Sequence, residues 1–350
     1  MKEIKVGIIG SGGIANIAHV PGYLALRDKD VRITALCDIK PEAMENTIKR
    51  HGLDGVEQYL DFRQMLRKAD VDVVSVCTPN NVHMPATVAA LQAGKHVICE
   101  KPIARNGREG TKMVQAARKS RRQLMIGQSF RFGARPQAVK RAIDAGMLGD
   151  IYYARSWAIR RREVPAKDTF LDKEKSGGGP LIDIGVHSLD LTLYLMGFPK
   201  PVRVSGRIWT KFGNRPNVIG TWGQWDYRHF EVEDCAVALI HFANGAAVTL
   251  EASFASNISE PLMEVVLLGT AGGAEVGSGK IYTEEAGTLW DRTPYGLPKE
   301  HAYLDEIAMF VDAVRNDKPV PVPGHEALMT VRILDAIYQS AKTGKEVKMK

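Results

Sequence analysis

From Ile4 to Gln128, short apolar runs of strand length alternate with segments of helical period, and no other feature constrains the fold as strongly. A parallel sheet with crossover helices requires this alternation. The expected strands are Lys5–Ile9, Val31–Cys37, a weak one near Val56, Val71–Cys77, His96–Cys99 and Leu124–Gln128. The expected helices are Ile14–Leu26, Pro41–His51, Asp61–Lys68, Val82–Ala93 and Gly107–Arg118. Six strands fit one doubly wound parallel sheet, so residues 1–125 are predicted to form a Rossmann domain of the α/β class.

After Gln128 the pattern becomes rich in strands. The Asn244-Gly245 pair is a strong hairpin signal, because both residues accept the positive φ of a tight turn. The expected elements are helices at Pro136–Ala145, Leu181–Met196, Tyr303–Arg315 and His325–Lys342, and strands at Ile151–Arg160, Asp234–Phe242, Ala246–Phe254 and Leu262–Leu268. We predict a second α/β domain over residues 126–350, built on an open mixed or antiparallel sheet. Its C-terminal helix is free to pack back on the first domain.

Composition excludes several classes of protein. The chain has 350 residues, 45% hydrophobic and 25% charged, which is typical of globular domains and excludes disorder. No apolar run approaches the roughly 18–20 residues of a membrane span, and no targeting segment precedes the first strand, so a cytoplasmic protein is expected. The net charge of +7 is dispersed, unlike the basic stripe of a nucleic-acid-binding protein. Four well-separated cysteines lack C-x-x-C spacing and are expected to be free thiols.

A glycine-rich turn follows the first predicted strand. The segment from Gly10 to Ala15 matches the dinucleotide fingerprint G-x-G-x-x-G/A, with Ala15 in the third position. Gly10 permits the tight turn, and Gly12 lets the backbone approach a pyrophosphate. The free N–H groups of the helix start, over Gly13 and Ile14, face the anion. An unliganded doubly wound domain is the alternative.

The next strand ends in Asp38, where a carboxylate accepts hydrogen bonds from the adenosine ribose hydroxyls. A 2′-phosphate would meet this negative charge, and Ile39 offers no donor in place of the arginine that such a phosphate requires. The predicted cofactor is therefore NAD and not NADP. Lys40 is the counter-argument, because its ammonium is close enough in sequence to approach a phosphate.

Two further motifs carry chemistry. Glu100-Lys101-Pro102 ends a predicted parallel strand at its carboxyl edge, which places Lys101 beside the cofactor crevice. A strand-end lysine taken alone is more often a surface residue. The second motif runs from Gly177 to Asp190 and begins a helix that is apolar almost all round, hence buried.

On this buried helix, Asp183 and His187 are four residues apart and are expected to share one face. Three interpretations compete for the pair: a hydrogen-bonded core pair, a metal site that includes Asp190, and acid–base chemistry. No cysteine or second histidine follows at ligand spacing, so no metal is predicted. Histidine titrates near neutrality and can accept the hydroxyl proton as a hydride leaves the carbon.

These motifs occur in one order together with Thr78-Pro79-Asn80 and His83, and in this the chain resembles the Gfo/Idh/MocA family of sugar and inositol dehydrogenases. The resemblance covers nearly the whole chain. It implies a Rossmann domain, a substrate-binding α/β domain whose sheet often mediates assembly into homodimers or homotetramers, and a carbohydrate or polyol substrate. The cofactor-binding residues that it implies are Gly10, Gly12, Gly13, Ile14, Asp38, Thr78, Pro79, Asn80, His83, Glu100 and Lys101.

The resemblance also implies catalytic roles. Lys101 would hydrogen-bond the reacting hydroxyl, Asp183 would bind substrate and orient the imidazole, and His187 would be the base. Some relatives assign the proton transfer to the lysine, but histidine needs less adjustment of its pKa. The expected function is hydride transfer between NAD and a secondary hydroxyl of a sugar, glycoside or inositol. The alternatives are an NAD-retaining glycosidase that oxidises the ring transiently, and a non-catalytic sugar or dinucleotide sensor.

A basic stretch after Ile151 supplies candidate substrate contacts. Trp157 could stack on a sugar ring, and Arg160 or Arg161 could bind hydroxyls or a phosphate. The alternative is a solvated basic loop with Trp157 in the core. The identity of the sugar, the carbon that is oxidised and the physiological direction stay open at this stage.

Overall fold

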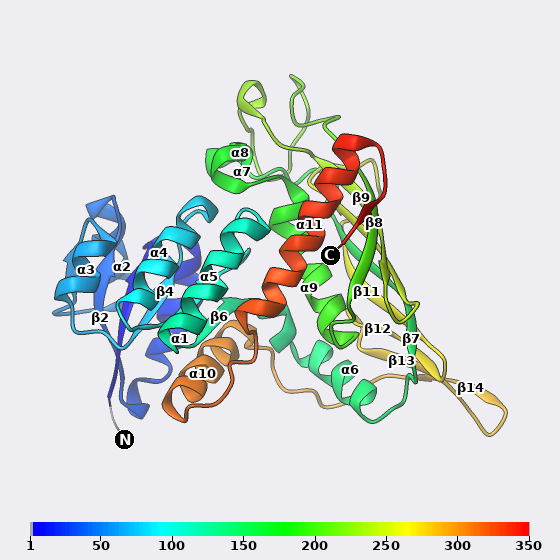
Figure 1. Cartoon of the computed structure of the whole chain (residues 1–350), viewed down its shortest axis with the longest axis horizontal. Coiled ribbons are helices and arrows are strands. Elements are labelled where there is room, and N and C mark those ends of the chain that lie inside the picture. The colour runs from blue at the N-terminus through cyan, green and yellow to red at the C-terminus, as the bar shows by residue number, and fades with distance from the viewer. Residues whose placement is uncertain (1–2, 350) are drawn as a thin grey trace. The chain divides into compact units, whose positions relative to one another are not determined.

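The computed structural model describes residues 3–349 and divides the chain into two compact units (Figure 1). Unit 1 comprises Met1–Ser129 and His301–Leu328, and unit 2 comprises Phe130–Glu300 and Met329–Lys350. Residues 301–328 thus belong with the N-terminal unit, although the sequence pattern placed them in the second domain. The physical reason is a close packing of helices, since Gly22 lies against Ile307, where an added Cβ would come within 2.7 Å of the isoleucine side chain.

Unit 1 is built on a six-stranded parallel sheet with the order β3-β2-β1-β4-β5-β6. The strands are β1 (Ile4–Ile9), β2 (Val31–Cys37), β3 (Glu57–Tyr59), β4 (Val73–Val76), β5 (His96–Glu100) and β6 (Leu124–Gly127). The helices are α1 (Val20–Leu24), α2 (Pro41–His51), α3 (Phe62–Lys68), α4 (Asn80–Gln92), α5 (Gly107–Ser120) and α10 (Ala302–Arg315). The order reverses between β1 and β4, which is the position where doubly wound sheets bind ligands. The predicted Rossmann architecture is confirmed.

The first helix differs from its prediction. The expected helix Ile14–Leu26 is instead a π-helical segment, η1 (Ala15–His19), that continues into the short helix α1. A wide π turn changes which side chains point at the sheet. Here His19, the last residue of the π-helical segment, is completely buried within unit 1.

Unit 2 is built on a nine-stranded mixed sheet with the order β14-β13-β12-β11-β7-β10-β9-β8-β15. Its strands are β7 (Ile151–Ile159), β8 (Pro201–Trp209), β9 (Cys235–Phe242), β10 (Ala247–Ser253), β11 (Leu262–Gly269), β12 (Gly272–Glu275), β13 (Lys280–Glu285), β14 (Thr288–Arg292) and β15 (Val347–Lys348). Its helices are α6 (Ala134–Asp144), α7 (Asp168–Leu171), α8 (Lys173–Ser176) and α9 (Val186–Leu195), together with most of α11 (Gly324–Thr343). The predicted hairpin at Asn244-Gly245 joins β9 to β10, with Gly245 at φ +86°.

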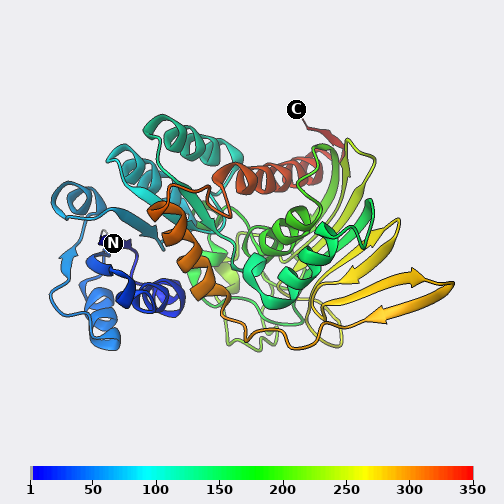
Figure 2. The ribbon, with the colours of Figure 1, turned by 90° about the horizontal axis from the view of Figure 1, so that it is seen from below.

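The helices of unit 2 cover one face of this sheet and leave the other face open (Figure 2). On β7 the residues alternate as a half-buried strand requires: Ala154, Ser156 and Ala158 are fully buried, whereas Arg155 is exposed. Ser156 donates a hydrogen bond to Ser188 of α9 over 3.0 Å, which shows that the buried side faces this helix. Among residues 3–349, no helix combines the length and the apolar character that a membrane span needs.

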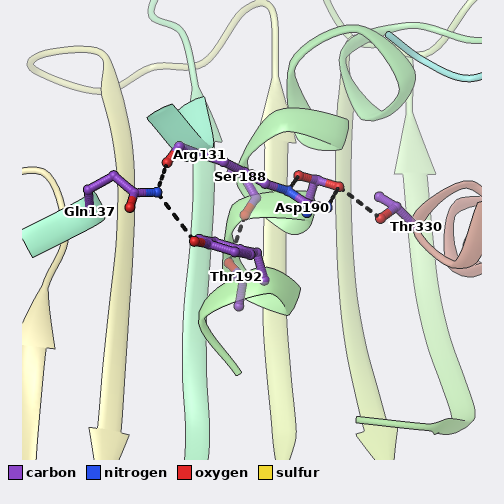
Figure 3. Close-up of polar contacts among 7 residues, drawn as sticks. Arg131, Gln137, Ser188, Asp190, Thr192 and Thr330 are labelled. Atoms are coloured by element: carbon purple, nitrogen blue, oxygen red, sulfur yellow. Dashed lines mark hydrogen bonds and ion pairs between the residues drawn. The ribbon is translucent and has the colours of Figure 1, made fainter. Parts of the chain in front are cut away.

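A buried ion pair connects α9 to the start of unit 2 (Figure 3). Arg131 donates from Nε and Nη2 to the two carboxylate oxygens of Asp190 over 2.7 and 2.8 Å, and both side chains are at most 2% exposed. Thr330 donates to the same carboxylate over 3.5 Å. The rings of Tyr194 and Phe198 each lie 5.0 Å from the guanidinium carbon, so the cation is enclosed by aromatic faces.

Candidate functional site

The glycine-rich turn of unit 1 forms a cradle that only glycine permits at its first position. Gly10 has φ +93°, and an added Cβ would lie 2.6 Å from the carbonyl oxygen of Cys77. At Gly12 and Gly13, by contrast, an added Cβ would meet nothing within 4 Å. The backbone on this side is therefore open to an approaching group, and this is the geometry that a pyrophosphate needs.

Two buried hydroxyls beside this turn lack hydrogen-bond partners within the described residues. They belong to Ser11, which follows β1, and Thr78, which follows β4, and these two strands are neighbours in the sheet. Buried polar groups in native proteins are nearly always hydrogen-bonded, so these hydroxyls point to a ligand rich in acceptors. The cradle and the two hydroxyls together fit the diphosphate of a dinucleotide.

Asp38 lies at the end of the next strand and is prepared to accept further hydrogen bonds. Its two carboxylate oxygens accept from the backbone N–H of Ser11 over 2.8 Å and of Lys40 over 2.9 Å. Each oxygen keeps lone-pair capacity for a ribose hydroxyl. The side chain of Ile39 is 83% exposed and offers no donor to a 2′-phosphate.

A buried polar network supports the end of β5. The Nε2 of His19 lies 2.9 Å from Glu100, and its Nδ1 lies 3.0 Å from the hydroxyl of Ser75, which also contacts the hydroxyl of Tyr23 over 2.8 Å. Burial raises the pKa of Tyr23 and keeps its phenol protonated. The same Glu100 accepts from the backbone N–H of Lys101 over 3.2 Å. The network was not predicted, because its side-chain hydrogen bonds join residues that are 52 to 81 positions apart in sequence and share no motif.

Lys101 is followed by a cis peptide bond to Pro102, and His83 connects this turn to the turn after β4. The two ring nitrogens of His83 lie 2.8 Å from the carbonyl oxygens of Pro102 and Thr78. The ring is 1% exposed, and burial lowers its pKa. This geometry favours a positioning role for His83 over the predicted direct contact with a cofactor. Pro79 and Asn80 begin α4 at the same edge of the sheet.

In unit 2 the predicted helix Leu181–Met196 is two elements. Asp183 lies in a π-helical turn, η4 (Leu181–Gly185), and His187 lies in the first turn of α9. The two residues are therefore not four positions apart on one regular α-helix, because the wider turn shifts the angle between them. The imidazole of His187 stacks on Phe130, with ring centroids 4.6 Å apart and planes inclined by 19°.

Close packing explains the glycines before Asp183. An added Cβ at Gly178 would lie 2.0 Å from the hydroxyl of Tyr338, and one at Gly179 would lie 2.0 Å from the carbonyl oxygen of Glu233. The buried carboxylate of Glu233 accepts from the backbone N–H of Leu181 over 3.2 Å and from Tyr338 over 2.8 Å. Glu233 and Tyr338, which sequence reasoning missed, thus set the start of the turn that carries Asp183.

Arg160 is the predicted substrate residue that the structure brings to Asp183. Its guanidinium lies 4.0 Å from the Asp183 carboxylate and 3.7 Å from that of Glu163. The ring of Trp222 covers the guanidinium at 4.2 Å, and that of Phe254 lies at 5.6 Å. Burial lowers the pKa of Arg160, while the two carboxylates act in the opposite direction. The group stays cationic because its ordinary pKa is so high.

The other two predicted substrate residues lie elsewhere. Arg161 is exposed and donates to the carbonyl oxygen of Ser259 over 2.9 Å. Trp157 lies on the outer face of the nine-stranded sheet, where its Nε1 donates to Glu251 over 3.1 Å. The prediction that Trp157 stacks on a sugar ring is not supported, because the two-residue period of β7 turns its side chain to the face opposite α9, the helix that carries His187.

The metal interpretation of the pair included Asp190 as a third ligand. Asp190 is engaged by Arg131, as described above. No group of three or more His, Cys, Asp or Glu side chains within residues 3–349 is placed to hold a metal ion.

Lys101 belongs to unit 1, whereas Asp183 and His187 belong to unit 2. Their convergence on one hydroxyl stays a prediction.

Comparisons with known proteins agree with these features. Residues 4–128 match the NAD-binding Rossmann-fold model of an oxidoreductase family, and residues 140–349 match the C-terminal α/β-domain model of the same family. The chain is 34% identical to D-glucoside 3-dehydrogenase of Escherichia coli over 99% of its own length and 98% of that protein. It is 25% identical to myo-inositol 2-dehydrogenase of Thermotoga maritima over 99% of its length and 98% of that protein.

Among solved structures, levoglucosan dehydrogenase in complex with NADH and levoglucosan superimposes with a TM-score of 0.85 at 25% identity, covering 99% of each chain. That fold match extends over both units, each of which carries the elements expected of its domain. The family models also cover nearly all of the chain. The chain therefore belongs to the Gfo/Idh/MocA oxidoreductase family and contains its NAD-binding Rossmann fold and its C-terminal α/β domain.

Proposed function

We propose that this protein is an NAD-dependent dehydrogenase that transfers a hydride between the cofactor and a secondary hydroxyl of a sugar, glycoside or inositol. The observation that carries the proposal is a combination found in this chain. It has an open dinucleotide cradle and the residues Lys101, Asp183 and His187, and it is 34% identical over 99% of its length to D-glucoside 3-dehydrogenase. Sugar and polyol dehydrogenases recur among its relatives.

In the proposed mechanism NAD, when bound, supplies the carbon that accepts the hydride. Gly10 and Gly12 form the cradle for its diphosphate, and Asp38 accepts from its ribose. The ammonium of Lys101 hydrogen-bonds the substrate oxygen and stabilises the negative charge that develops there. An imidazole nitrogen of His187 takes the hydroxyl proton.

Asp183 and Arg160 complete the substrate side of this mechanism. We propose that Asp183 accepts hydrogen bonds from a neighbouring hydroxyl of the ring. The guanidinium of Arg160 lies 4.0 Å from this carboxylate and limits its rotation. Phe130 restricts the imidazole of His187 to one plane. Both side chains are thus prepared before substrate binds.

The proposed function is tested with a panel of inositols, aldoses, glycosides and nucleotide sugars, assayed for formation of NADH and in parallel for NADPH. Net NADH formation with at least one secondary alcohol is the expected result. Release of a hydrolysed sugar without net NADH would instead assign an NAD-retaining glycosidase. Binding without either product would contradict both enzymatic assignments.

Cofactor preference gives a separate prediction. We expect NAD to exceed NADP in kcat/KM by about 100-fold or more, because a 2′-phosphate beside the Asp38 carboxylate is repelled by several kcal/mol. The double variant Asp38→Ser, Ile39→Arg should remove most of this preference, as measured by kcat/KM with each cofactor. Lys40→Ala is the matched control and should leave the ratio unchanged. A wild-type enzyme that turns over faster with NADP would contradict this use of Asp38.

We further propose that the protein assembles into homodimers or homotetramers through the outer face of the nine-stranded sheet. Trp157 and Leu239 share this face, because the register pairs Trp157 with Glu251 and Leu239 with Thr249 on β10. Leu239 is 37% exposed although its strand, β9, has a neighbouring strand on each side. Apolar side chains that gather on one exposed face are typical of an interface.

The change Leu239→Lys tests this assembly. It is expected to reduce the molar mass measured by light scattering after gel filtration, since a buried charge at the interface is costly. Leu289→Lys, at an 82% exposed position of β14, serves as the control and should keep the wild-type mass. A wild-type protein that elutes as a monomer would contradict the proposal.

We also propose that the protein is located in the cytoplasm. All four cysteines are free thiols, three of them buried. Free thiols without disulfides are typical of proteins in a reducing compartment.

A further inference from the structure

Gln128 is a buried polar residue that nothing in the proposed mechanism uses. It directly follows β6 at the carboxyl end of the strand, and its side chain is 1% exposed. Neither its amide nitrogen nor its amide oxygen has a hydrogen-bond partner among the described residues. A buried amide without partners is strongly unfavourable, so a group with a complementary acceptor and donor is expected to meet it.

The sheet order tells which part of a dinucleotide reaches this position. Along the carboxyl edge the strands lie in the order β2, β1, β4, β5 and β6. The segments that follow them carry Asp38, Ser11, Thr78, Lys101 and Gln128, respectively. A doubly wound sheet binds one mononucleotide on each side of its switch point, which here lies between β1 and β4. Asp38 identifies the adenosine side. Gln128 therefore stands on the nicotinamide side, one strand beyond Lys101.

On the neighbouring strand β5, Glu100 is the residue to consider as a hydrogen-bond partner of the Gln128 amide. Gly127 pairs with Glu100 across β5 and β6, and an added Cβ at Gly127 would lie 3.1 Å from the Glu100 carboxylate. That carboxylate is already engaged by His19 and by the backbone of Lys101. No hydrogen bond joins it to the Gln128 amide, which therefore stays available to a ligand.

We propose that Gln128 recognises the carboxamide of the nicotinamide ring. A carboxamide presents one carbonyl acceptor and N–H donors, which is the complement of a glutamine side chain. The Gln128 N–H donates to the carbonyl of the ring substituent, and its Oε1 accepts from the N–H of that substituent. The pair fixes the rotation of the ring and hence the face that it presents to the substrate. This inference rests on the proposed use of NAD.

The test compares two probes that differ only beyond the second ribose. NADH carries the nicotinamide, whereas ADP-ribose keeps the adenosine and the diphosphate and lacks the ring. Gln128→Leu is expected to weaken NADH binding by about 10- to 100-fold, because a carboxamide is left unpaired in a buried site. Its affinity for ADP-ribose should match that of the wild type. Isothermal titration calorimetry measures all four affinities.

Gln123→Leu is the matched control, since it makes the same change on the opposite end of β6, where the side chain donates to the carbonyl oxygen of Lys318 over 3.1 Å. It should change neither affinity. Gln128→Leu should also keep or raise the melting temperature of the ligand-free protein, because it removes two unpaired buried polar atoms. A melting temperature that falls together with both affinities would assign Gln128 a structural role and overturn the inference.

Two further outcomes separate this inference from the proposed function. If wild-type protein binds ADP-ribose and NADH but Gln128→Leu binds both normally, Gln128 does not contact the ring and the inference fails alone. If wild-type protein binds neither probe, the proposed use of NAD fails as well.

Discussion

Replacing His187 with alanine is expected to lower kcat/KM by about 10²- to 10⁴-fold, the range that a positioned general base contributes. Under the proposed mechanism the hydroxyl proton then has no acceptor as the hydride leaves. The acidic limb of the pH profile of kcat/KM should disappear together with the rate. Initial velocities across pH with the best substrate from the panel provide the measurement. His187→Gln, which keeps hydrogen-bonding capacity without basicity, should lose nearly as much.

His325→Ala is the matched control for this prediction, because His325 is exposed in the first turn of α11 and far along the chain from the candidate residues. It should retain wild-type kinetics. Retention of NADH affinity by His187→Ala would show that the loss is chemical. Turnover within a few-fold of wild type and an unchanged pH profile would mean that His187 is not the base, and Lys101 would become the candidate.

Breaking the buried ion pair between Arg131 and Asp190 should cost unit 2 much of its stability. Asp190→Asn or Arg131→Met each leaves a buried charge without its partner, and such changes typically destabilise a protein by about 3–5 kcal/mol. The corresponding fall in melting temperature is roughly 6–20 °C for a domain of this size. Thermal unfolding followed by circular dichroism measures this effect.

A double variant separates the cost of an unpaired charge from the contribution of the pair itself. Arg131→Met combined with Asp190→Leu removes both charges and should recover much of the lost stability, since apolar replacements of buried ion pairs are often neutral. Asp312→Asn is the control, because its ion pair with Lys318 is exposed and should contribute little to stability. Equal losses at Asp190 and Asp312 would refute this account.

Much of the Rossmann unit was predictable because its signals are local. Strands β1 and β2 and helix α2 lie within one residue of their predicted bounds, since parallel strands are continuous apolar runs and helices repeat every 3.6 residues. Gly10 could be identified in advance because the fingerprint after β1 requires a glycine at the tight turn. The structure shows why: the residue has a positive φ, and an added Cβ would clash with Cys77. Asp38 followed from its place at the end of β2.

The candidate site of unit 2 was only partly predictable. The order of motifs pointed to Asp183 and His187, but the π turn that separates them has no strong sequence signal. The interpretation of Trp157 failed on a question of register. A shift of the strand by a single residue moves a tryptophan from one face of the sheet to the other. The apolar–polar alternation around Trp157 was too weak to predict which face it occupies.

The residue order by itself determined the alternation of elements, the glycine turn after β1 and the types of side chain that carry chemistry. Periodicity and backbone sterics act over a few residues, so they can be recognised in an isolated sequence. Only the tertiary structure decided that His19 supports Glu100, that Arg131 neutralises Asp190, and that the amide of Gln128 is buried without a partner. These contacts join residues up to 81 positions apart or depend on what surrounds a side chain, and no local rule specifies either.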